Sequence, residues 1–354
     1  WNINSSNSNT GIIMANYDAV SGLRIPVVSS DPSTLSEGQL WYNTTVDKFR
    51  GYGLYQVNAA WSTAPSGLNA GRRACAGTGS IDDGIGFGGY IGGYPRYGGS
   101  ETFNGSSWSN QPNLPTPLGQ SICHVGTGSA AAGIAGYYFS GPSASVGSRH
   151  SKWNGSSWST ASSLPSTRYG LGGVGNGTDD YHVGGGAHAN GGYFPQTTSW
   201  SWNGSSWSSE PAVNWTPGTG AETTAWGSST NDWFATVSGS TNRFFQYNGS
   251  SWSTHPATFG ASTDGRSIWG SSNSATTTGG PGGPATTTQT WDGSTWSTSP
   301  ATSNNNHIEA LRGGGSAASS SGWIFGGGPG NGVSQGENFA GPVNSVQKVN
   351  LDFS

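Results

Sequence analysis

The chain has 354 residues, of which 61 are glycine and 17 are tryptophan, while only 8% are charged. Glycine supplies turns and aromatic side chains supply burial, so this composition indicates an all-β protein and argues against a helical or a disordered one. The formal net charge is −4 and no basic cluster occurs, which argues against a nucleic-acid partner. The sequence also has no apolar run of about eighteen residues, so no membrane insertion is predicted.

Residues 1–50 differ from the remainder in their sequence pattern and are predicted to form an N-terminal docking or cap segment. Strand-forming residues flank the stretch from Asn43 to Asp47, which predicts a β-hairpin with its turn at these residues. Because side chains alternate between the two faces of a strand, we expect Leu40, Tyr42 and Phe49 to form the packed face of this hairpin.

Residues 51–354 contain a hexapeptide that recurs about every 45 to 50 residues, the spacing of propeller blades. The copies run from Phe103 to Trp108, Trp153 to Trp158, Trp202 to Trp207, Tyr247 to Trp252 and Trp291 to Trp296, and a degraded copy ends at Trp61. Asn-Gly tolerates a positive φ, so each copy is predicted to be a hairpin corner whose two aromatic residues form a cross-strand pair. The residues that define the repeat are Trp61, Trp108, Trp158, Trp207, Trp252, Trp296, Gly105, Gly155, Gly204, Gly249 and Gly293.

Each repeat is predicted to hold four strands. An inner strand follows the tryptophan, as in Gly170–Gly177, a second strand ends in Gly-Gly, and the corner joins a third strand to a fourth. In the last repeat we expect the third strand at Asn344–Phe353. The segment around Trp61 is expected to add the outermost strand of that repeat and so to close the ring.

Two pairs of residues occupy matching places in different repeats. Cys75 and Cys123 each precede a Gly-Thr-Gly-Ser tetrapeptide at offsets that differ by one residue, which favours two buried free thiols over a disulfide. The doublets Asp82-Asp83 and Asp179-Asp180 fit hairpin turns better than a calcium site, because the other repeats lack equivalents.

The pattern of Gly185-Gly186 followed by Trp202 and Trp207, with Gly327-Gly328 in the last repeat, resembles that of kelch-repeat propellers. The corner loop is shorter than in the common kelch form, and glycine and serine replace its charged turn residues. The resemblance implies a six-bladed β-propeller of four-stranded blades over residues 51–354, preceded by a small N-terminal β segment.

The stretch from the Pro32 turn towards Trp61 resembles a short module of tail-fibre and other structural proteins of bacteriophages. The residues that carry this resemblance are Glu37-Gly38-Gln39-Leu40, Trp41-Tyr42-Asn43-Thr44 and Lys48-Phe49-Arg50-Gly51-Tyr52. The resemblance implies a virion protein on the particle surface that binds other virion proteins through its N-terminal segment. The propeller would then face a glycan or protein receptor on the host, and a homo-oligomer is compatible with this arrangement. A hairpin that only caps the propeller is the alternative interpretation.

No catalytic or metal-binding constellation stands out. His182 and His188 flank a glycine-rich stretch but lack further ligands, so neither a metal site nor a cofactor is predicted. The kelch family includes a copper radical oxidase, whose chemistry needs a tyrosine linked to a cysteine, yet Cys75 and Cys123 lie beside no tyrosine. The acids available for glycan hydrolysis are Asp82, Asp179, Glu101 and Glu210, whose spacing favours no pair, and we predict a protein that is not an enzyme.

Binding is the better functional class, because aromatic rings stack on sugars while small polar residues bond to their hydroxyls. The candidate contacts are Tyr90, Tyr94, Tyr97, Tyr193 and Phe194, in two glycine-rich loops. Packing of these aromatics between blades is the alternative. A further alternative is a glycosylated extracellular scaffold, since Asn104, Asn154, Asn203 and Asn248 begin Asn-x-Ser sequons.

Overall fold

The computed structural model describes residues 25–57, 59–91, 97–119, 122–140, 143–189, 193–215, 223–237, 243–259, 266–279, 286–299, 319–327, 334–341 and 343–351. The described secondary structure is all β-strand. The chain divides into unit 1, which comprises residues 1–59 and 341–354, and unit 2, which comprises residues 60–340. The boundary therefore lies nine residues beyond the expected one, and the C-terminal residues join the N-terminal segment.

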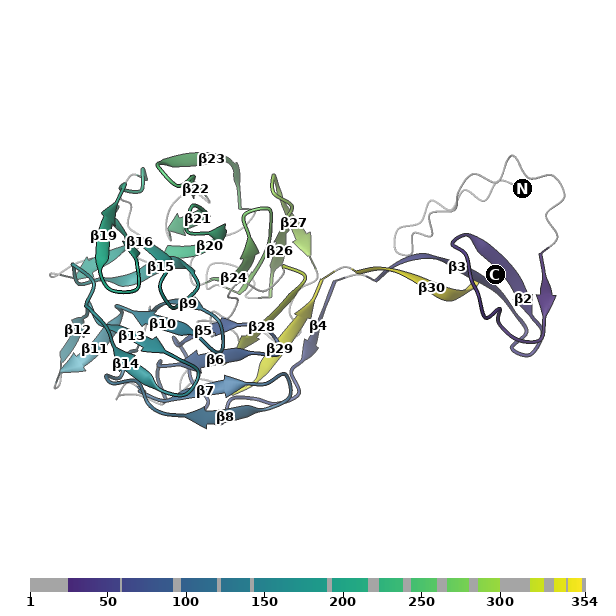
Figure 1. Ribbon diagram of the computed structural model, residues 1–354, viewed down its shortest axis with the longest axis horizontal. Helices are drawn as coiled ribbons and strands as arrows, with labels where there is room; N and C mark the ends of the chain where they lie inside the picture. Colours follow the sequence, from purple (N-terminus) through teal and green to yellow (C-terminus); the bar gives the residue numbers. More distant parts are fainter. Residues whose placement is uncertain are drawn as a thin grey trace. The chain divides into compact units, whose positions relative to one another are not determined.

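Unit 2 contains six successive main sheets in its described part, numbered here in chain order and visible in Figure 1. Sheet 1 consists of β5 (Ala76–Gly79), β6 (Gly84–Phe87), β7 (Ser100–Phe103) and β8 (Trp108–Gln111). Sheet 2 consists of β9 (Cys123–Gly126), β10 (Ala131–Ile134), β13 (His150–Trp153) and β14 (Trp158–Thr160). Between β10 and β13 lies a separate hairpin of β11 (Tyr137–Ser140) and β12 (Ser143–Val146).

The next two sheets follow the same antiparallel order. Sheet 3 consists of β15 (Tyr169–Gly175), β16 (Tyr181–Ala189), β18 (Ser199–Trp202) and β19 (Trp207–Glu210), with β17 (Tyr193–Pro195) paired to the end of β16. Sheet 4 consists of β20 (Thr223–Ser229), β21 (Asp232–Val237), β22 (Arg243–Tyr247) and β23 (Trp252–Thr258).

The last two sheets differ in where their strands come from. Sheet 5 consists of β24 (Arg266–Ser271), β25 (Ser274–Gly279), β26 (Thr288–Trp291) and β27 (Trp296–Ser299). Sheet 6 consists of β28 (Ser321–Phe325), β29 (Gly336–Ala340) and β4 (Ala60–Thr63). Strand β4 comes from the start of the unit 2 sequence and completes a sheet whose other strands come from its end, and Trp61 pairs with Phe339. The expectation that the Trp61 segment supplies the outermost strand of the last repeat is confirmed.

The expected third strand of that repeat was wrong. Residues 343–351 form β30 (Val343–Leu351), which pairs with β3 (Lys48–Val57) of unit 1 and not with sheet 6. The third-strand position is taken by β29, which lies between β28 and β4. Both segments alternate in a strand-like way, and the pairing with β3 extends over nine residue pairs, which accounts for the place of β30 in unit 1.

The hexapeptide corners have the predicted geometry. Phe103 is opposite Trp108 and Trp153 opposite Trp158, and the other three copies pair in the same way. The corner glycines have φ between 89° and 93°, a region that L side chains rarely adopt. Each sequon asparagine holds the turn through its side chain; Asn104 Oδ1, for example, accepts bonds from the backbone N–H of Ser106 at 3.0 Å and Ser107 at 2.9 Å.

Each sheet packs against the next one. The inner strands β5, β9, β15, β20 and β24 contact one another in this order. Sheet 6 meets sheet 5 where the rings of Trp61 and Trp269 lie edge to face at 6.1 Å, and it meets sheet 1 where the rings of Trp323 and Trp108 lie 5.8 Å apart. The packing contacts therefore run from sheet 1 to sheet 6 and back to sheet 1, and the outer strands β8, β14, β19, β23 and β27 lie at the rim of unit 2 (Figure 1).

The corner tryptophans also bond to the preceding sheet, a feature that the sequence did not predict. In four of them the indole Nε1 donates a hydrogen bond of 2.9 to 3.1 Å across the boundary between sheets. The bonds run from Trp158 to Ser100 Oγ, from Trp207 to the Ser162 carbonyl, from Trp252 to the Pro211 carbonyl and from Trp61 to Thr288 Oγ1. The same residue thus closes its own hairpin and joins two sheets.

Unit 1 contains a sheet in the order β1 (Val27–Val28), β2 (Gln39–Asn43), β3 and β30. The predicted hairpin is present, with Asn43 opposite Lys48. The prediction of its packed face was wrong, because Trp41 on the other face is fully buried while Phe49 is 36% exposed. Trp41 Nε1 donates to Asp31 Oδ1 at 3.0 Å, and this carboxylate also pairs with Arg50, so a polar network covers the Trp41 face.

Candidate binding site

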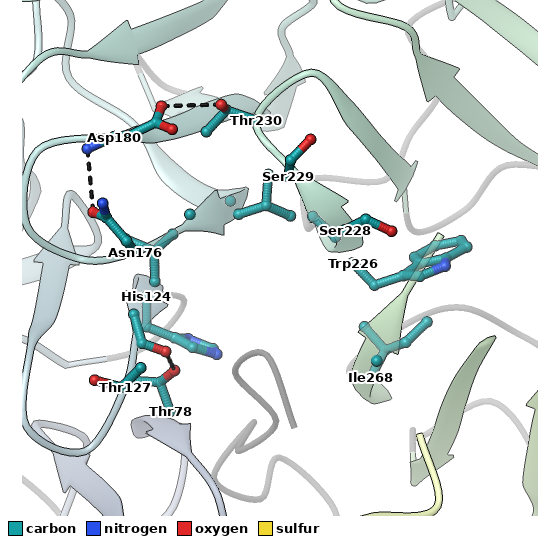
Figure 2. Close-up of a pocket in the computed structure, with 18 residues that line it drawn as sticks. Thr78, His124, Thr127, Asn176, Asp180, Trp226, Ser228, Ser229, Thr230 and Ile268 are labelled. Carbon is teal, nitrogen blue, oxygen red and sulfur yellow. Dashed lines mark hydrogen bonds between the residues drawn. The ribbon is translucent and has the colours of Figure 1, made fainter. Parts of the chain in front are cut away.

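A cavity of about 340 Å³ lies where the inner strands of sheets 2 to 4 end, with Thr78 of sheet 1 and Ile268 and Gly270 of sheet 5 completing its lining (Figure 2). The strands that position its walls are β5, β9, β15, β20 and β24. The turns after β9, β15 and β20 contribute Thr127, Asn176, Asp180 and Thr230, and the end of β20 contributes Ser228 and Ser229. The labelled lining residues are Thr78, His124, Thr127, Asn176, Asp180, Trp226, Ser228, Ser229, Thr230 and Ile268.

Glycines at the ends of the inner strands create this arrangement. Gly79, Gly126, Gly175 and Gly270 have φ between 109° and 136°. A Cβ at any of them would lie 2.1 to 2.3 Å from a backbone carbonyl oxygen of the following turn, a distance at which atoms overlap. Each inner strand therefore reverses directly into its neighbour, and small polar residues of the turn reach the cavity.

Asn176 and Asp180 form the polar wall on sheet 3. Asn176 Oδ1 accepts bonds from the backbone N–H of Thr178, Asp179 and Asp180 at 2.8, 3.0 and 3.1 Å, which fixes the turn. Asp180 Oδ1 accepts a bond of 2.9 Å from Thr230 Oγ1 on the turn of sheet 4 (Figure 2). The carboxylate is exposed, so it can accept further bonds from a ligand.

His182 supports this wall from inside the protein. Its side chain is 2% exposed, and Nδ1 lies 3.3 Å from the Thr230 carbonyl oxygen, to which it donates. Burial lowers the pKa of His182, although the bond to Thr230 and the charges of Glu210 and Asp180 oppose this effect. The imidazole is therefore expected to stay neutral near pH 7 and to hold Thr230 in place.

The opposite wall is less polar. Trp226 is 2% exposed and Ile268 is 7% exposed, and Ser228 and Ser229 lie between Trp226 and Thr230. Among the described lining residues Asp180 is the only carboxylate, and none is lysine or arginine. The cavity therefore combines neutral hydroxyl and amide groups, one imidazole and one carboxylate with an apolar side, a set suited to hydrogen bonding a small neutral polar molecule.

The predicted aromatic contacts do not line this cavity. Tyr90 is 8% exposed, and the Arg73 guanidinium lies over its ring at 5.7 Å, while Tyr97 is half-buried with Arg72 at 4.9 Å from its ring centre. Tyr94 lies outside the described residues. Tyr193 and Phe194 form β17, and their side chains are outside the described part.

The acids considered for catalysis lie in separate places. Glu101, on β7 of sheet 1, is fully buried and forms an ion pair with Arg72, which is also fully buried. Its Oε2 accepts a bond of 2.7 Å from the Asn69 backbone N–H. Glu210, on β19 of sheet 3, accepts bonds from Ser201 and Tyr247.

The other expectations concern turns, thiols and metals. Asp82 and Asp179 lie in the hairpin turns that were predicted for the two acidic doublets. Cys75 and Cys123 are buried and form no disulfide, as favoured from the sequence. The His188 side chain is outside the described part, and no three His, Cys, Asp or Glu residues gather at metal-binding distance in the part that is described.

No described helix has the length and hydropathy that a bilayer crossing needs.

No protein-family model and no curated protein matches the chain.

The cavity was not predicted from the sequence, although the sequence contains a signal for it. Each inner strand from sheet 1 to sheet 5 has a glycine at or within two residues of its end, followed by small polar residues, as in Gly126-Thr127 and Gly175-Asn176. Taken one at a time, each of these segments predicts only a turn. Their recurrence at the ends of strands that contact one another is what brings their side chains into one place.

Proposed function

We propose that the chain is a bacteriophage virion component whose unit 2 is a six-bladed, kelch-like propeller that attaches the particle to a glycan of the host surface. The propeller assignment is supported by the repeating corners and by packing contacts that run from sheet 1 through sheet 6 and back to sheet 1. The virion assignment rests on the resemblance of the stretch from the Pro32 turn towards Trp61 to a module of phage structural proteins.

The cavity is the observation that supports binding of a glycan. A sugar offers several hydroxyl groups and one apolar ring face, and the cavity offers Asn176, Asp180 and Thr230 on one side and Trp226 and Ile268 on the other. Its volume of about 340 Å³ lies at the lower end of the range for small-ligand sites, which suits one or two sugar units. The absence of lysine and arginine from the described lining disfavours a phosphate ligand.

Binding without cleavage follows from the same residues. Glycoside hydrolysis by the common route needs two carboxyl groups about 5 to 10 Å apart, one on each side of the scissile bond. Asp180 is the single carboxylate among the described lining residues, and Glu101 and Glu210 are held in contacts elsewhere. The proposed protein therefore recognises a glycan and does not cut it. The aromatic loops of Tyr90–Tyr97 and Tyr193–Phe194 remain proposed additional contacts.

The test is binding of host-envelope polysaccharides to the intact chain by calorimetry. We expect Asp180→Asn to weaken saturable binding about tenfold, because a hydrogen bond to a charged acceptor contributes about 1.5–3 kcal/mol. Asp82→Asn is the matched control, since Asp82 occupies a turn of sheet 1 outside the cavity lining. No saturable binding, or equal losses in both variants, would contradict the proposed site, and shortened glycan products would contradict binding alone.

The virion assignment is tested separately by immunogold labelling of native particles with an antibody to unit 2. Label on a tail or capsid appendage supports it. Label on cell surfaces or extracellular fibres, together with modified asparagines at the four corner sequons, would support the glycosylated scaffold and contradict the virion component.

A further inference from the structure

The aspartates of unit 2 gather at one end of its strands. The turns that follow the inner strands meet at the cavity, and the hexapeptide corners lie beside these turns. A Cβ on Gly105 would come within 2.9 Å of Asp82, and a Cβ on Gly204 would come within 3.0 Å of Asp179. We call this end of unit 2 the turn face. It carries all six described aspartates of the unit, namely Asp82, Asp83, Asp179, Asp180, Asp232 and Asp292.

The arginines lie at the opposite end of the strands. The first and third strands of each sheet start at the end away from the turn face, because neighbouring strands are antiparallel. Lys152, the one lysine of the unit, lies with its ammonium group 5.8 Å from the centre of the Trp202 ring. The five arginines whose side chains are described all lie in or shortly before the start of such a strand, namely Arg72, Arg73, Arg149, Arg168 and Arg243.

Two neighbouring carboxylates lie at the sheet 3 side of the cavity. Asp180 belongs to the lining, and Asp179 Oδ1 accepts a bond of 2.8 Å from Nδ2 of the lining residue Asn176. Both side chains are exposed. The turn after β15 therefore places two negative charges at the cavity.

Two more carboxylates lie next to the lining on other sheets. Asp232 of sheet 4 accepts a bond from Ser272 Oγ, and the Ser272 backbone N–H donates to Oγ of the lining residue Ser228 at 3.1 Å. Asp83 of sheet 1 lies beside Gly128, where a Cβ would come within 2.3 Å of its Oδ1. Carboxylates of three sheets thus surround a cavity whose described lining holds no lysine or arginine.

Asp180 combines its charge with open acceptor positions. Thr230 Oγ1 donates to Oδ1 at 2.9 Å, whereas a carboxylate has about four acceptor positions (Figure 2). The other titratable side chain of the described lining is that of His124. Trp226 and Ile268 form the apolar wall, and low-dielectric walls strengthen the field of the charges around a cleft. A cation in this cavity is therefore attracted to Asp180.

We propose that the glycan bound in this cavity carries a protonated amine, as an amino sugar does. This inference rests on the proposed glycan binding and adds the chemical class of the sugar. The hydroxyl and amide groups of the lining suit a neutral sugar, and an ammonium in place of one sugar hydroxyl adds a charge-assisted bond to Asp180. The surrounding carboxylates attract the same charge and repel an acidic sugar.

The experiment is calorimetry of the intact chain near pH 7 with two probes of equal size. One probe is cellobiose, and the other is its diamino analogue, in which an ammonium replaces one hydroxyl of each ring. We expect the diamino dimer to bind at least about tenfold tighter, because a hydrogen bond between charged groups is stronger than a neutral one. The difference should shrink as salt is added. Equal binding, or tighter binding of cellobiose, would overturn the proposal.

Two variants test whether the cavity produces this preference. Asp180→Asn keeps an acceptor for Thr230 and should lower the ratio of the two dissociation constants from about ten to about one. Asp292→Asn is the matched control, because it removes an exposed carboxylate of the turn face outside the cavity lining. Asparagine already occupies this position in the other four hexapeptides. A ratio that falls equally in both variants would overturn the proposal.

A second measurement separates the amine from the glycan binding on which the proposal rests. A host-envelope polysaccharide that binds the chain is treated with acetic anhydride, which converts its free amines into uncharged amides. We expect saturable binding to weaken at least about tenfold relative to a mock-treated sample. Undiminished binding after the treatment would overturn the amine and leave glycan binding intact, whereas no binding before the treatment would overturn both.

Discussion

The bond between Trp158 and Ser100 provides a quantitative test of how the sheets are held together. Trp158 forms the corner pair of sheet 2 with Trp153, at 5.5 Å between ring centres, and packs against Phe87 of sheet 1 at 4.9 Å. Its Nε1 donates to Ser100 Oγ on β7 at 3.0 Å. Replacing Trp158 by Phe keeps an aromatic ring in the corner and removes this donor.

The expected loss has two parts. A neutral hydrogen bond contributes about 0.5–1.5 kcal/mol to the free energy of unfolding. The smaller ring gives up roughly 40 Å² of apolar contact, which adds about 1 kcal/mol. We therefore expect Trp158→Phe to lower the free energy of unfolding by about 2 kcal/mol, of which about 1 kcal/mol belongs to the bond between the sheets.

A double-mutant cycle with Ser100→Ala isolates that bond. The cycle is needed because Ser100 Oγ also donates to the Pro112 carbonyl at 2.8 Å, so the single variant loses two bonds. Equilibrium unfolding in urea, followed by far-UV circular dichroism, gives the four values. We expect a coupling energy of about 1 kcal/mol, consistent with direct contact.

Trp296 is the control for this reasoning. It occupies the same corner position in sheet 5, but its Nε1 is buried and has no acceptor in the described part of the chain. Removing an unpaired buried donor relieves a cost, so Trp296→Phe should be close to neutral. A coupling energy below about 0.3 kcal/mol for Trp158 and Ser100, or an equal loss in Trp296→Phe, would refute the assignment of a stabilising bond between sheets.

Three further predictions concern other parts of unit 2. Gly155 has a φ of 93°, and a Cβ there would meet a single described atom within 4 Å, the Ser129 carbonyl oxygen at 3.2 Å. Gly155→Ala should therefore cost about 1–2 kcal/mol in urea unfolding, chiefly through backbone strain, and Gly155→Asn should cost less; equal costs would contradict this. Arg72→Met leaves the buried Glu101 carboxylate unpaired and should cost about 3–5 kcal/mol, part of which adding Glu101→Met recovers; a variant as stable as the native chain would exclude the buried pair. Burial lowers the pKa of His150 to about 4, against the opposing bond to the Ser162 carbonyl. The pKa of a histidine in the unfolded chain is about 6.5, so the neutral His150 stabilises the folded state fully above that pH, and this contribution is lost as the pH falls towards about 4. The midpoint of thermal unfolding should therefore fall with pH over this range, and His150→Phe should make it less dependent on pH.

The sequence predicted the local features of the fold and missed those that depend on distant contacts. The corner of Trp202 and Trp207 could be predicted because Asn-Gly sets a turn without help from the rest of the chain. The assignment of β30 failed because an alternating segment does not indicate which strand it pairs with. The packed face of the unit 1 hairpin failed for a related reason. Burial of Trp41 depends on Asp31, which lies ten residues earlier and supplies the polar partners of that face.

The candidate cavity also depends on contacts between residues far apart in the sequence, so it could not be predicted either. Its polar groups come from turns that look alike in sequence, and only the order of the inner strands decides which of them share a space. Asp180 and Thr230 are fifty residues apart and meet through a bond of 2.9 Å. The buried pair of Arg72 and Glu101 was not predicted either, because the sequence shows Glu101 only as one of several acids available for glycan hydrolysis and does not indicate its partner.

The way β4 completes sheet 6 constrains how the protein folds. Sheets 1 to 5 use strands that follow one another closely, so each can form as soon as its own segment has left the ribosome. Sheet 6 has to bring Trp61 to Phe339, and closing a loop of about 280 residues costs about 5 kcal/mol of chain entropy before those contacts form. We therefore expect the last step of folding to be slow and to occur after synthesis. Until that step, a nascent chain carries the edge of β4 unpaired.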